Sequence, residues 1–363
     1  MVCRWVVLRL SSTLLVNGRN RIAMKINRRQ LLALSAATAS APVLTACSGD
    51  KPAPSIDTSL PVGPFGKDST AEEVTRDMDL SGQVMLVTGC NSGIGYETLR
   101  VLALRGAHVI GTGRTLQKAR KACESVAGDT TPMALELSDF QSVVDCAGSV
   151  QQMGLSLDAL ILNAGMNSVG GDLTLVNGIE QMFVVNFLGH FILANHLAPM
   201  MVAAGKGRIV HVGSQSGYLR APPEGIDFNN LRGEGEYDAI HAYGRSKLAN
   251  QLFSLELAKR LAGTTVTSNA LHPGLVNTNL VRNVPEIVRR GIKLLGTVIA
   301  KTPEQGAATQ VYVATNERVE EVSGAFYVDC NPARISGQHH MFDAPMSRTL
   351  WATAEEMTAA YLV

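Results

Sequence analysis

A tyrosine and a lysine stand four positions apart in the stretch AYGRSKLAN, at Tyr243 and Lys247. The sequence from Tyr243 to Ala262 is typical of a helix, and residues four apart lie on one helix face. A free phenol has a pKa near ~10, too high for ready proton exchange at neutral pH. A neighbouring ammonium lowers that pKa, so the pair predicts a proton donor for carbonyl reduction or an acceptor for alcohol oxidation. The same spacing is also common on helix surfaces, so other motifs must decide.

A glycine-rich stretch, TGCNSGIG, carries Gly89, Gly93 and Gly95. The apolar run from Val84 to Val87 before it predicts a buried strand, and a helical pattern follows it. At such a junction the helix N-terminus offers free N–H groups and a positive dipole end to a phosphate. The first glycine permits the turn, the second permits close approach, and the third permits tight packing. In this context the glycines predict a dinucleotide site.

The next predicted strand, His108 to Gly113, ends at Arg114. An acidic residue near this point would bind the ribose hydroxyls of the cofactor and favour NAD. None is present, and arginine is the residue type that accommodates a 2′-phosphate. The sequence therefore favours NADP over NAD.

The composition is that of a globular α/β enzyme, with 363 residues, 46% hydrophobic and 5% aromatic. This length suffices for one large α/β domain with additional segments. Lys+Arg 32 against Asp+Glu 31 leaves no basic field that would indicate a nucleic-acid partner. The six cysteines and the pair His339-His340 lack metal-ligand spacing, so we expect no metal and free thiols. Beyond residue 47 we expect no apolar run of membrane-spanning length.

Further motifs follow in a fixed order: LILNAG, VVNFLGHF, GRIVHVGSQSG, AYGRSKLAN and HPGLVNT. Together with TGCNSGIG they resemble the short-chain dehydrogenase/reductase superfamily over about residues 66–355. IDFNNL, KTPEQGA and VSGAFYVDC resemble its branch of retinol dehydrogenases and WW domain-containing oxidoreductases. The resemblance implies an α/β fold with a doubly wound, Rossmann-type and mainly parallel sheet, helices on both faces, and a single catalytic domain.

The resemblance also implies roles for individual residues. Ser214 would hydrogen-bond the substrate oxygen, with Ser216 as its competitor, and Asn186 would bind a water that links Lys247 to solvent. Lys247 and Tyr243 would also contact the cofactor. The other cofactor contacts that the resemblance implies, beyond the three glycines and Arg114, are Asn91, Ser92, Ile94, Glu136, Leu137, Asn163, Ala164, Gly165, Pro273, Gly274, Val276 and Thr278.

Residues 1–47 resemble an export leader. Met24 begins a complete signal, with a positive start, an apolar middle and small residues before Cys47, and we expect it to be the true start. Arg28 and Arg29 resemble a twin-arginine signal, the type that exports folded proteins, and LTAC resembles a lipobox. We therefore expect a lipoprotein of the bacterial cell envelope, anchored to the membrane through Cys47. A cytoplasmic protein with an uncleaved N-terminus is the alternative.

Residues 48–68 are rich in proline and glycine and predict a flexible linker, followed by the dehydrogenase/reductase domain at 69–363. Our functional prediction is an NADP(H)-dependent oxidoreductase that interconverts an alcohol and an aldehyde or ketone. A non-catalytic nucleotide-binding sensor or scaffold on the same fold is the alternative. The apolar segment at 281–295 suggests a hydrophobic substrate, although packing on the core explains it equally well. The oligomeric state stays open, a homodimer included.

Overall fold

The computed structural model describes residues 51–168, 170–276 and 300–362. The leader at 1–47, Thr278 and the apolar segment at 281–295 lie outside the described residues. The described residues belong to one compact unit.

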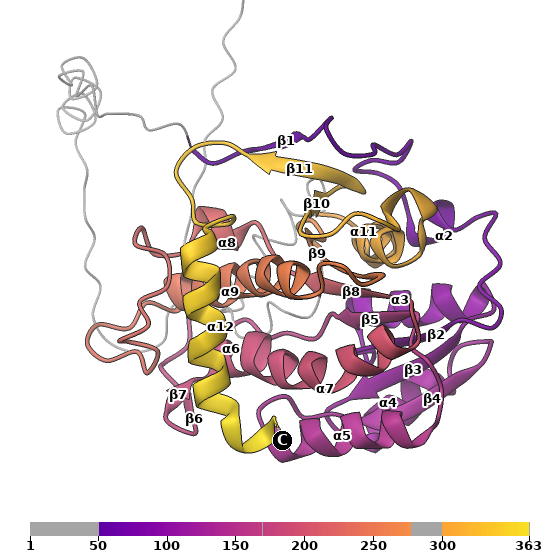
Figure 1. The fold of residues 1–363 in the computed structure, drawn as a ribbon, viewed down its shortest axis with the longest axis horizontal. Coiled ribbons are helices and arrows are strands. Elements are labelled where there is room, and N and C mark those ends of the chain that lie inside the picture. Colours follow the sequence, from indigo (N-terminus) through magenta and orange to yellow (C-terminus); the bar gives the residue numbers. More distant parts are fainter. Residues whose placement is uncertain (1–50, 169, 277–299, 363) are drawn as a thin grey trace, which may run out of the picture. The chain divides into compact units, whose positions relative to one another are not determined.

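A nine-stranded sheet runs through the centre of the domain in the order β1-β11-β10-β9-β8-β5-β2-β3-β4 (Figure 1). The strands from β4 to β10 pair in parallel, whereas β11 and β1 pair antiparallel at one edge. This topology confirms the predicted doubly wound fold. The strands are β1 Pro54–Ile56, β2 Val84–Val87, β3 His108–Gly113, β4 Thr130–Ala134, β5 Ala159–Leu162, β8 Gly207–Val212, β9 Val266–His272, β10 Phe326–Val328 and β11 Asn331–Ile335, with a separate hairpin of β6 Leu175–Val176 and β7 Ile179–Glu180.

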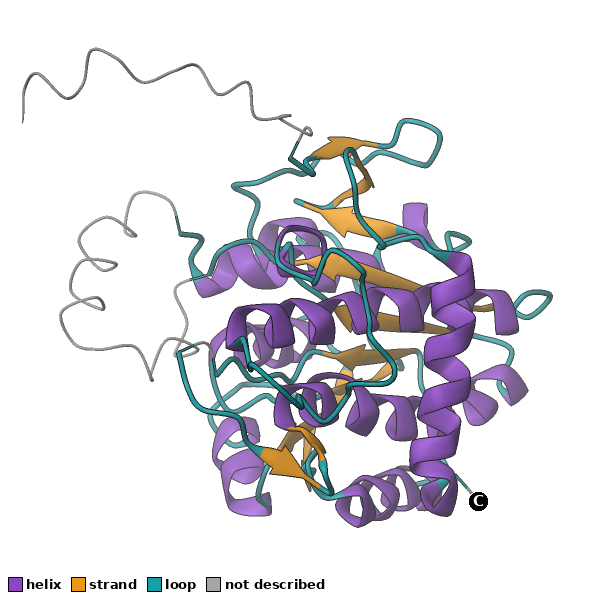
Figure 2. Cartoon of the chain, turned by 90° about the vertical axis from the view of Figure 1, so that its left-hand side faces the viewer, coloured by secondary structure: helices purple, strands orange, loops and turns teal. Residues whose placement is uncertain are grey.

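Alternate side chains of the central strands enter two different cores. In β2, Val84 and Leu86 join one core while Met85 and Val87 join the other, as the period of two in a strand dictates. A strand buried on both faces is uninterrupted in apolar residues. Helices α5, α7 and α9 cover one face, and α3 and α11 cover the other (Figure 2). The helices are α2 Ala71–Val74, α3 Gly93–Leu104, α4 Leu116–Cys123, α5 Phe140–Gln152, α6 Gln181–Phe183, α7 Gly189–Ala203, α8 Ser216–Leu219, α9 Ala239–Arg260, α11 Pro303–Thr315 and α12 Ala344–Thr358.

One continuous helical stretch, Gln181–Ala203, is long and apolar enough by length and composition to cross a membrane, with a mean hydropathy of 1.3. The expectation of no such run beyond the leader is therefore wrong for this segment. The asparagine and histidine residues of this stretch interrupt the apolar run, but they do not bring its mean hydropathy below that of a membrane-spanning helix. Because 78% of the apolar window is buried inside the protein, packing against the sheet accounts for this composition.

Residues 51–68, expected to be a flexible linker, carry strand β1 and belong to the domain. β1 extends the sheet beyond β11 (Figure 1). The carboxylate of Asp57 lies 2.9 Å from the guanidinium of Arg334, and the ring of Phe65 packs edge-on against Tyr312 with 5.9 Å between centroids. The linker prediction is wrong here because a short edge strand gains its stability from backbone pairing, which leaves little trace in composition.

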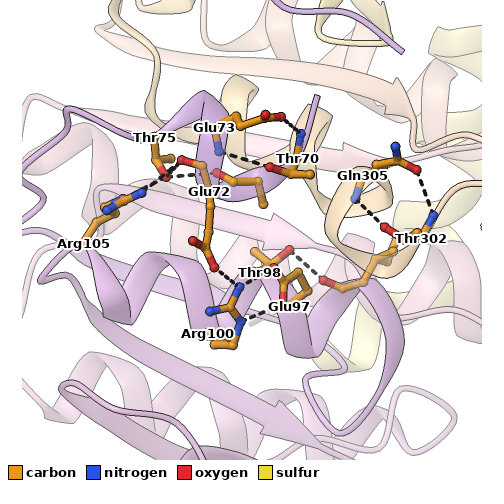
Figure 3. A network of polar contacts seen from close by, with 12 residues as sticks. Thr70, Glu72, Glu73, Thr75, Glu97, Thr98, Arg100, Arg105, Thr302 and Gln305 are labelled. Atoms are coloured by element: carbon orange, nitrogen blue, oxygen red, sulfur yellow. Dashed lines mark hydrogen bonds and ion pairs between the residues drawn. The ribbon is translucent and has the colours of Figure 1, made fainter. Parts of the chain in front are cut away.

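Polar contacts fix α3, the helix that follows the glycine-rich loop, to its neighbours (Figure 3). Capping boxes that start at Thr70 and Thr302 begin α2 and α11. Arg100 of α3 lies 2.6 Å from the carboxylate of Glu72 in α2 and 2.7 Å from that of Glu97 in its own helix. This network holds α3 in place at the end of the sheet where the loop lies.

Candidate active site

The glycine-rich loop joins β2 to α3, as the sequence predicts. Gly89 and Gly93 have φ angles of 73° and 63°, in the left-handed region that favours glycine. A Cβ on Gly89 would lie 2.9 Å from the Cβ of Ala164, and one on Gly95 would collide with the Asn163 side chain and the Gly89 carbonyl. The loop therefore requires glycine both for its backbone conformation and for its close packing.

The N-terminus of α3 is open to a ligand. Ser92 is the N-cap residue, and its side chain makes no capping hydrogen bond. Asn91 and Ser92 are exposed, whereas Ile94 is half-buried. Free N–H groups and the positive end of the helix dipole attract a phosphate. The residues of this loop fit the diphosphate of a dinucleotide.

The turn after β5 packs against this loop through Thr88. The side-chain amide of Asn163 donates to the Thr88 carbonyl at 2.7 Å, and the N–H of Ala164 donates to the Thr88 hydroxyl at 2.8 Å. Within the described part of the chain, Oδ1 of Asn163 is buried and has no hydrogen-bond partner. Such an acceptor beside the loop is a group that a donor on a bound cofactor would satisfy.

Two predicted site residues meet at Gly165. A Cβ on Gly165 would lie 3.2 Å from Oδ1 of Asn186 and 3.5 Å from Nζ of Lys247. The asparagine comes from the π-helical turn η1, Val184–Leu188, and the lysine comes from α9. The structure therefore brings the two side chains together against one exposed glycine.

Asn186 is buried and its side chain joins two segments of the chain. Nδ2 donates to the carbonyl of Met166 at 3.0 Å and to the hydroxyl of Ser246 at 2.9 Å, while Oδ1 accepts from the N–H of Met166 at 2.8 Å. These bonds use both amide protons, so the only further capacity of the side chain is on Oδ1. The side chain therefore anchors the segment after β5 to α9, a role beyond the water binding that the resemblance implies.

Lys247 is a buried cation, with 5% of its surface exposed. Its Nζ donates to the carbonyl of Val212 at 3.0 Å, and among the described residues no carboxylate forms an ion pair with it. Burial lowers the pKa of Lys247 from 10.5 to about 8, because the ammonium loses its hydration. The Nζ lies 5.9 Å from the centre of the Tyr243 ring.

The hydroxyl of Ser214 acts on the phenol of Tyr243 and by itself lowers the pKa of that group. Because the Ser214 oxygen accepts from the N–H of Ser216 at 3.1 Å, its own proton is available for the phenol oxygen. Burial raises the pKa of Tyr243, and the effect of the Ser214 hydroxyl opposes this more weakly. The pKa of Tyr243 is therefore raised, not lowered as the spacing of Tyr243 and Lys247 predicts, because the phenol loses its hydration.

The residues expected around the adenosine lie at the ends of β3 and β4. Arg114 follows β3 and is exposed. Oε1 of Glu136 accepts from the N–H and the hydroxyl of Ser138 at 3.1 Å and 2.7 Å, and Leu137 is buried. Glu136 is thus engaged within its own turn, while Arg114 offers a cation at the carboxyl end of the strand, where such sheets bind ligands.

The turn at 273–276 follows β9. Gly274 has a φ of 94°, and a Cβ there would lie 2.6 Å from Cδ of Lys301. Nζ of Lys301 lies 2.6 Å from the carboxylate of Asp329, and the backbone N–H of Lys301 donates to the carbonyl of Leu275 at 2.7 Å. An ion pair between the buried Lys301 and the half-buried Asp329 therefore fixes the base of this turn, which holds the predicted residues Pro273, Gly274 and Val276.

Comparison with known proteins decides the family. A model described as short chain dehydrogenase matches residues 83–225. Retinol dehydrogenase 14 of Homo sapiens is 36% identical over 298 residues, which cover 77% of this chain and 87% of the human protein. The chain belongs to the short-chain dehydrogenase/reductase family. It is accordingly a dehydrogenase-family enzyme that acts with NAD(P).

Other members of the family support the same branch and fold. The WW domain-containing oxidoreductase of Homo sapiens is 34% identical over 299 residues, which cover 80% of this chain and 71% of that protein. A crystal structure of an uncharacterized protein from Mycobacterium Paratuberculosis superimposes with a TM-score of 0.61 at 30% identity, covering 78% of this chain and 97% of that one. Both the suggested branch and the predicted fold are thereby confirmed.

Several groups at the short-chain dehydrogenase/reductase site were not predicted from the sequence. Thr88 precedes the first glycine of the loop, and Ser246 precedes Lys247. Their places next to predicted site residues could have identified both as part of the site. The Met166 backbone and the Val212 carbonyl had none, because a backbone partner can be supplied by any residue type.

Proposed function

We propose that this enzyme interconverts an alcohol and an aldehyde or ketone with NADP(H). The observation that carries the proposal is the ammonium of Lys247, which lies 5.9 Å from the centre of the Tyr243 ring, with the Ser214 hydroxyl favouring the phenolate of the same residue. A hydroxyl pair beside an unpaired cation is suited to exchanging a proton with a carbonyl oxygen. The bound cofactor would supply the hydride, and the protein orients the reacting groups.

Tyr243 would donate its proton to the carbonyl oxygen during reduction and accept it during oxidation. Ser214 would hydrogen-bond the same oxygen while its own oxygen stays held by the N–H of Ser216. The Lys247 ammonium would favour the phenolate as the proton leaves. Its lowered pKa, about 8, also places it near neutral pH, where it can pass protons on.

Asn186 would keep this arrangement in place. Its amide ties Ser246, the residue before Lys247, to the backbone of Met166. Removing that amide would leave buried polar groups without partners and loosen Lys247 at Gly165.

We further propose a preference for NADP over NAD. The support is the exposed Arg114 at the carboxyl end of β3, where an acidic residue would favour NAD. A guanidinium binds the 2′-phosphate through charge-assisted hydrogen bonds.

A hydrophobic alcohol or aldehyde is the substrate class that we propose. Three exposed apolar side chains, Leu219, Ile240 and Leu275, come from the segments next to Ser214, Tyr243 and Gly274. Small-molecule sites are lined mainly by apolar side chains, so apolar residues in these segments favour an apolar ligand. The names of two relatives, retinol dehydrogenases 11 and 14, point to a substrate of the same kind.

Export and lipid anchoring through Cys47 are a separate proposal. The support is the order of features in residues 24–47, which resembles a twin-arginine leader ending in a lipobox. Mass spectrometry of the protein from the membrane fraction would show a lipidated N-terminus at Cys47. Recovery from the cytoplasm with residues 24–47 intact would contradict the proposal.

The proposed reaction can be tested with purified enzyme, NADPH or NADH, and a panel of aldehydes of graded chain length. We expect NADPH-dependent reduction that becomes faster with longer apolar chains, with the alcohol identified by mass spectrometry. Nucleotide binding without turnover of any carbonyl or alcohol would instead support the non-catalytic scaffold.

A further inference from the structure

One buried histidine next to the site has no part in the proposed chemistry. His190 lies in the first turn of α7, four positions after Asn186, and is 2% exposed. Its ring bridges two segments that are far apart in the sequence. Nε2 lies 3.0 Å from the hydroxyl oxygen of Thr88, and Nδ1 lies 3.2 Å from the backbone oxygen of Asn186.

These contacts determine which ring nitrogen of His190 carries the proton. The Asn186 carbonyl can only accept a hydrogen bond, so Nδ1 must be the donor. In a neutral ring Nε2 is then an acceptor, and the Thr88 hydroxyl must donate to it. That hydroxyl oxygen also accepts from the N–H of Ala164 at 2.8 Å. The chain Ala164 N–H, Thr88 O–H, His190 N–H and Asn186 C=O thus runs in a single direction.

His190 stays neutral in this environment. Burial lowers its pKa from 6.5 to about 3, and the nearby charge of Lys247 adds to that lowering, whereas the bond to Asn186 opposes it. A proton on Nε2 would turn the Thr88 hydroxyl from a donor into an acceptor toward His190 and would reverse the bond between these two residues. Neither bond therefore changes across the neutral pH range.

The two ends of this chain belong to different parts of the proposed site. Thr88 is the residue before Gly89 of the cofactor loop, and its carbonyl is also held by Asn163. Asn186 lies in a π-helical turn, where a residue is inserted into the helical hydrogen-bond ladder. The Nδ1–H of His190 gives the Asn186 carbonyl a side-chain donor at this turn.

We propose that His190 is a positioning residue that ties the cofactor loop at Thr88 to the Asn186 turn of the proton-exchange site. The inference rests on the oxidoreductase function proposed above. Nδ1 fixes the position of the Asn186 turn and, through the Asn186 side chain, that of Ser246 and Lys247. Nε2 fixes the orientation of the Thr88 hydroxyl next to the cofactor loop. The two nitrogens therefore serve different steps.

Two amide substitutions separate these roles. The amide of His190→Asn reaches as far as Nδ1 and retains a donor for the carbonyl four residues earlier, as Asn195 does toward Phe191 at 2.8 Å in the same helix. The longer amide of His190→Gln reaches as far as Nε2 and retains a partner for Thr88. For His190→Asn we expect the NADPH Kd to rise about tenfold with kcat within about twofold of wild type. For His190→Gln we expect kcat to fall about tenfold with the Kd nearly unchanged.

Thr88→Val and Thr88→Ser provide matched controls at the other end. Thr88→Val should weaken NADPH binding as His190→Asn does. Combining Thr88→Val with His190→Asn should weaken binding no further than either change alone. Thr88→Ser should retain wild-type binding. Heteronuclear NMR of the imidazole in the protein without cofactor should show the Nδ1–H tautomer unchanged across neutral pH. This readout does not depend on activity, so it separates failure of the inference from failure of the proposed reaction.

The inference is overturned if both His190 variants keep wild-type kcat and Kd. It is also overturned if both variants lose the two quantities together, in proportion to a lower melting temperature, because that pattern describes a residue needed only for folding. An Nε2–H tautomer, or titration of the ring near neutral pH, would contradict it independently.

Discussion

Two buried lysines in this enzyme differ in whether a carboxylate neutralises their charge. Lys301 is 6% exposed and paired with the carboxylate of Asp329 at 2.6 Å. Lys247 is 5% exposed, and within the described residues its Nζ is bonded to the Val212 carbonyl and to no carboxylate. An unpaired buried ammonium is energetically unfavourable, so its retention calls for a reason other than stability.

The difference assigns stability to one region and chemistry to the other. The Lys301 pair holds the turn at Gly274, so its charge is neutralised where it lies. The Lys247 charge is left available next to the phenol of Tyr243. Substitutions in the two regions should therefore differ in sign as well as in size.

The largest effect is expected at the catalytic phenol. Tyr243→Phe removes the proton donor and should lower kcat about 10²- to 10⁴-fold, with the NADPH Kd and the melting temperature nearly unchanged. Steady-state kinetics and a nucleotide titration measure both quantities. A variant that keeps more than about a tenth of wild-type kcat would contradict the assigned role.

Lys247→Met should abolish turnover and yet stabilise the fold. At pH 7, below the folded pKa of about 8 and the unfolded value of 10.5, the lysine is charged in both states and the wild type carries the full desolvation penalty, roughly 3 kcal/mol. Between these two values the unfolded state binds more protons, so the wild type gains stability as pH rises and the advantage of the variant shrinks. Denaturant unfolding at several pH values tests this, and a variant that is less stable at pH 7 would refute it.

The paired lysine should show the opposite behaviour. Asp329→Asn leaves the Lys301 ammonium buried without a counter-charge and should lower the free energy of unfolding by about 2 kcal/mol. Asparagine tolerates the φ of 52° at this position, so the backbone is preserved. Lys301→Met removes the charge but keeps the aliphatic chain against Gly274, and it should destabilise less. Equal losses in the two variants would mean that packing, not charge, holds this turn.

The smallest effect concerns an exposed cation. Arg114→Ala should raise the KM for NADPH roughly tenfold and leave that for NADH nearly unchanged, since only NADPH carries the 2′-phosphate. Arg120→Ala, an exposed change on the neighbouring α4, is the matched control. A parallel rise for both cofactors would show that Arg114 does not distinguish them.

The local parts of the fold were predictable from the sequence, and the distant pairings were not. The loop at Gly89 and the helix of Tyr243 each depend on a few consecutive residues, and both were correctly placed. The pairing of β1 with β11 joins segments near opposite ends of the chain. Neither strand has a composition that identifies its partner, because edge pairing depends on backbone groups.

The candidate site shows the same division. Side chains such as Lys247 and Asn186 could be named from motifs, and the structure brings these two together at Gly165. The loss of hydration that raises the pKa of Tyr243 and lowers that of Lys247 depends on the whole surrounding core, so motif spacing could not predict it. Lys301 and Asp329 stand in the motifs KTPEQGA and VSGAFYVDC, but neither motif indicates that the two side chains form a pair, since they lie on either side of α11.

The most direct test of the contrast between the two lysines is the titration of their amines by NMR, with isotope-labelled lysine in the intact enzyme. We expect one ammonium resonance to titrate at about 8 and to be absent from the Lys247→Met variant. A Lys247 resonance that titrates at or above 10.5, the ordinary lysine value, would contradict the account, because the cation beside Tyr243 would then have no unusual readiness to release its proton.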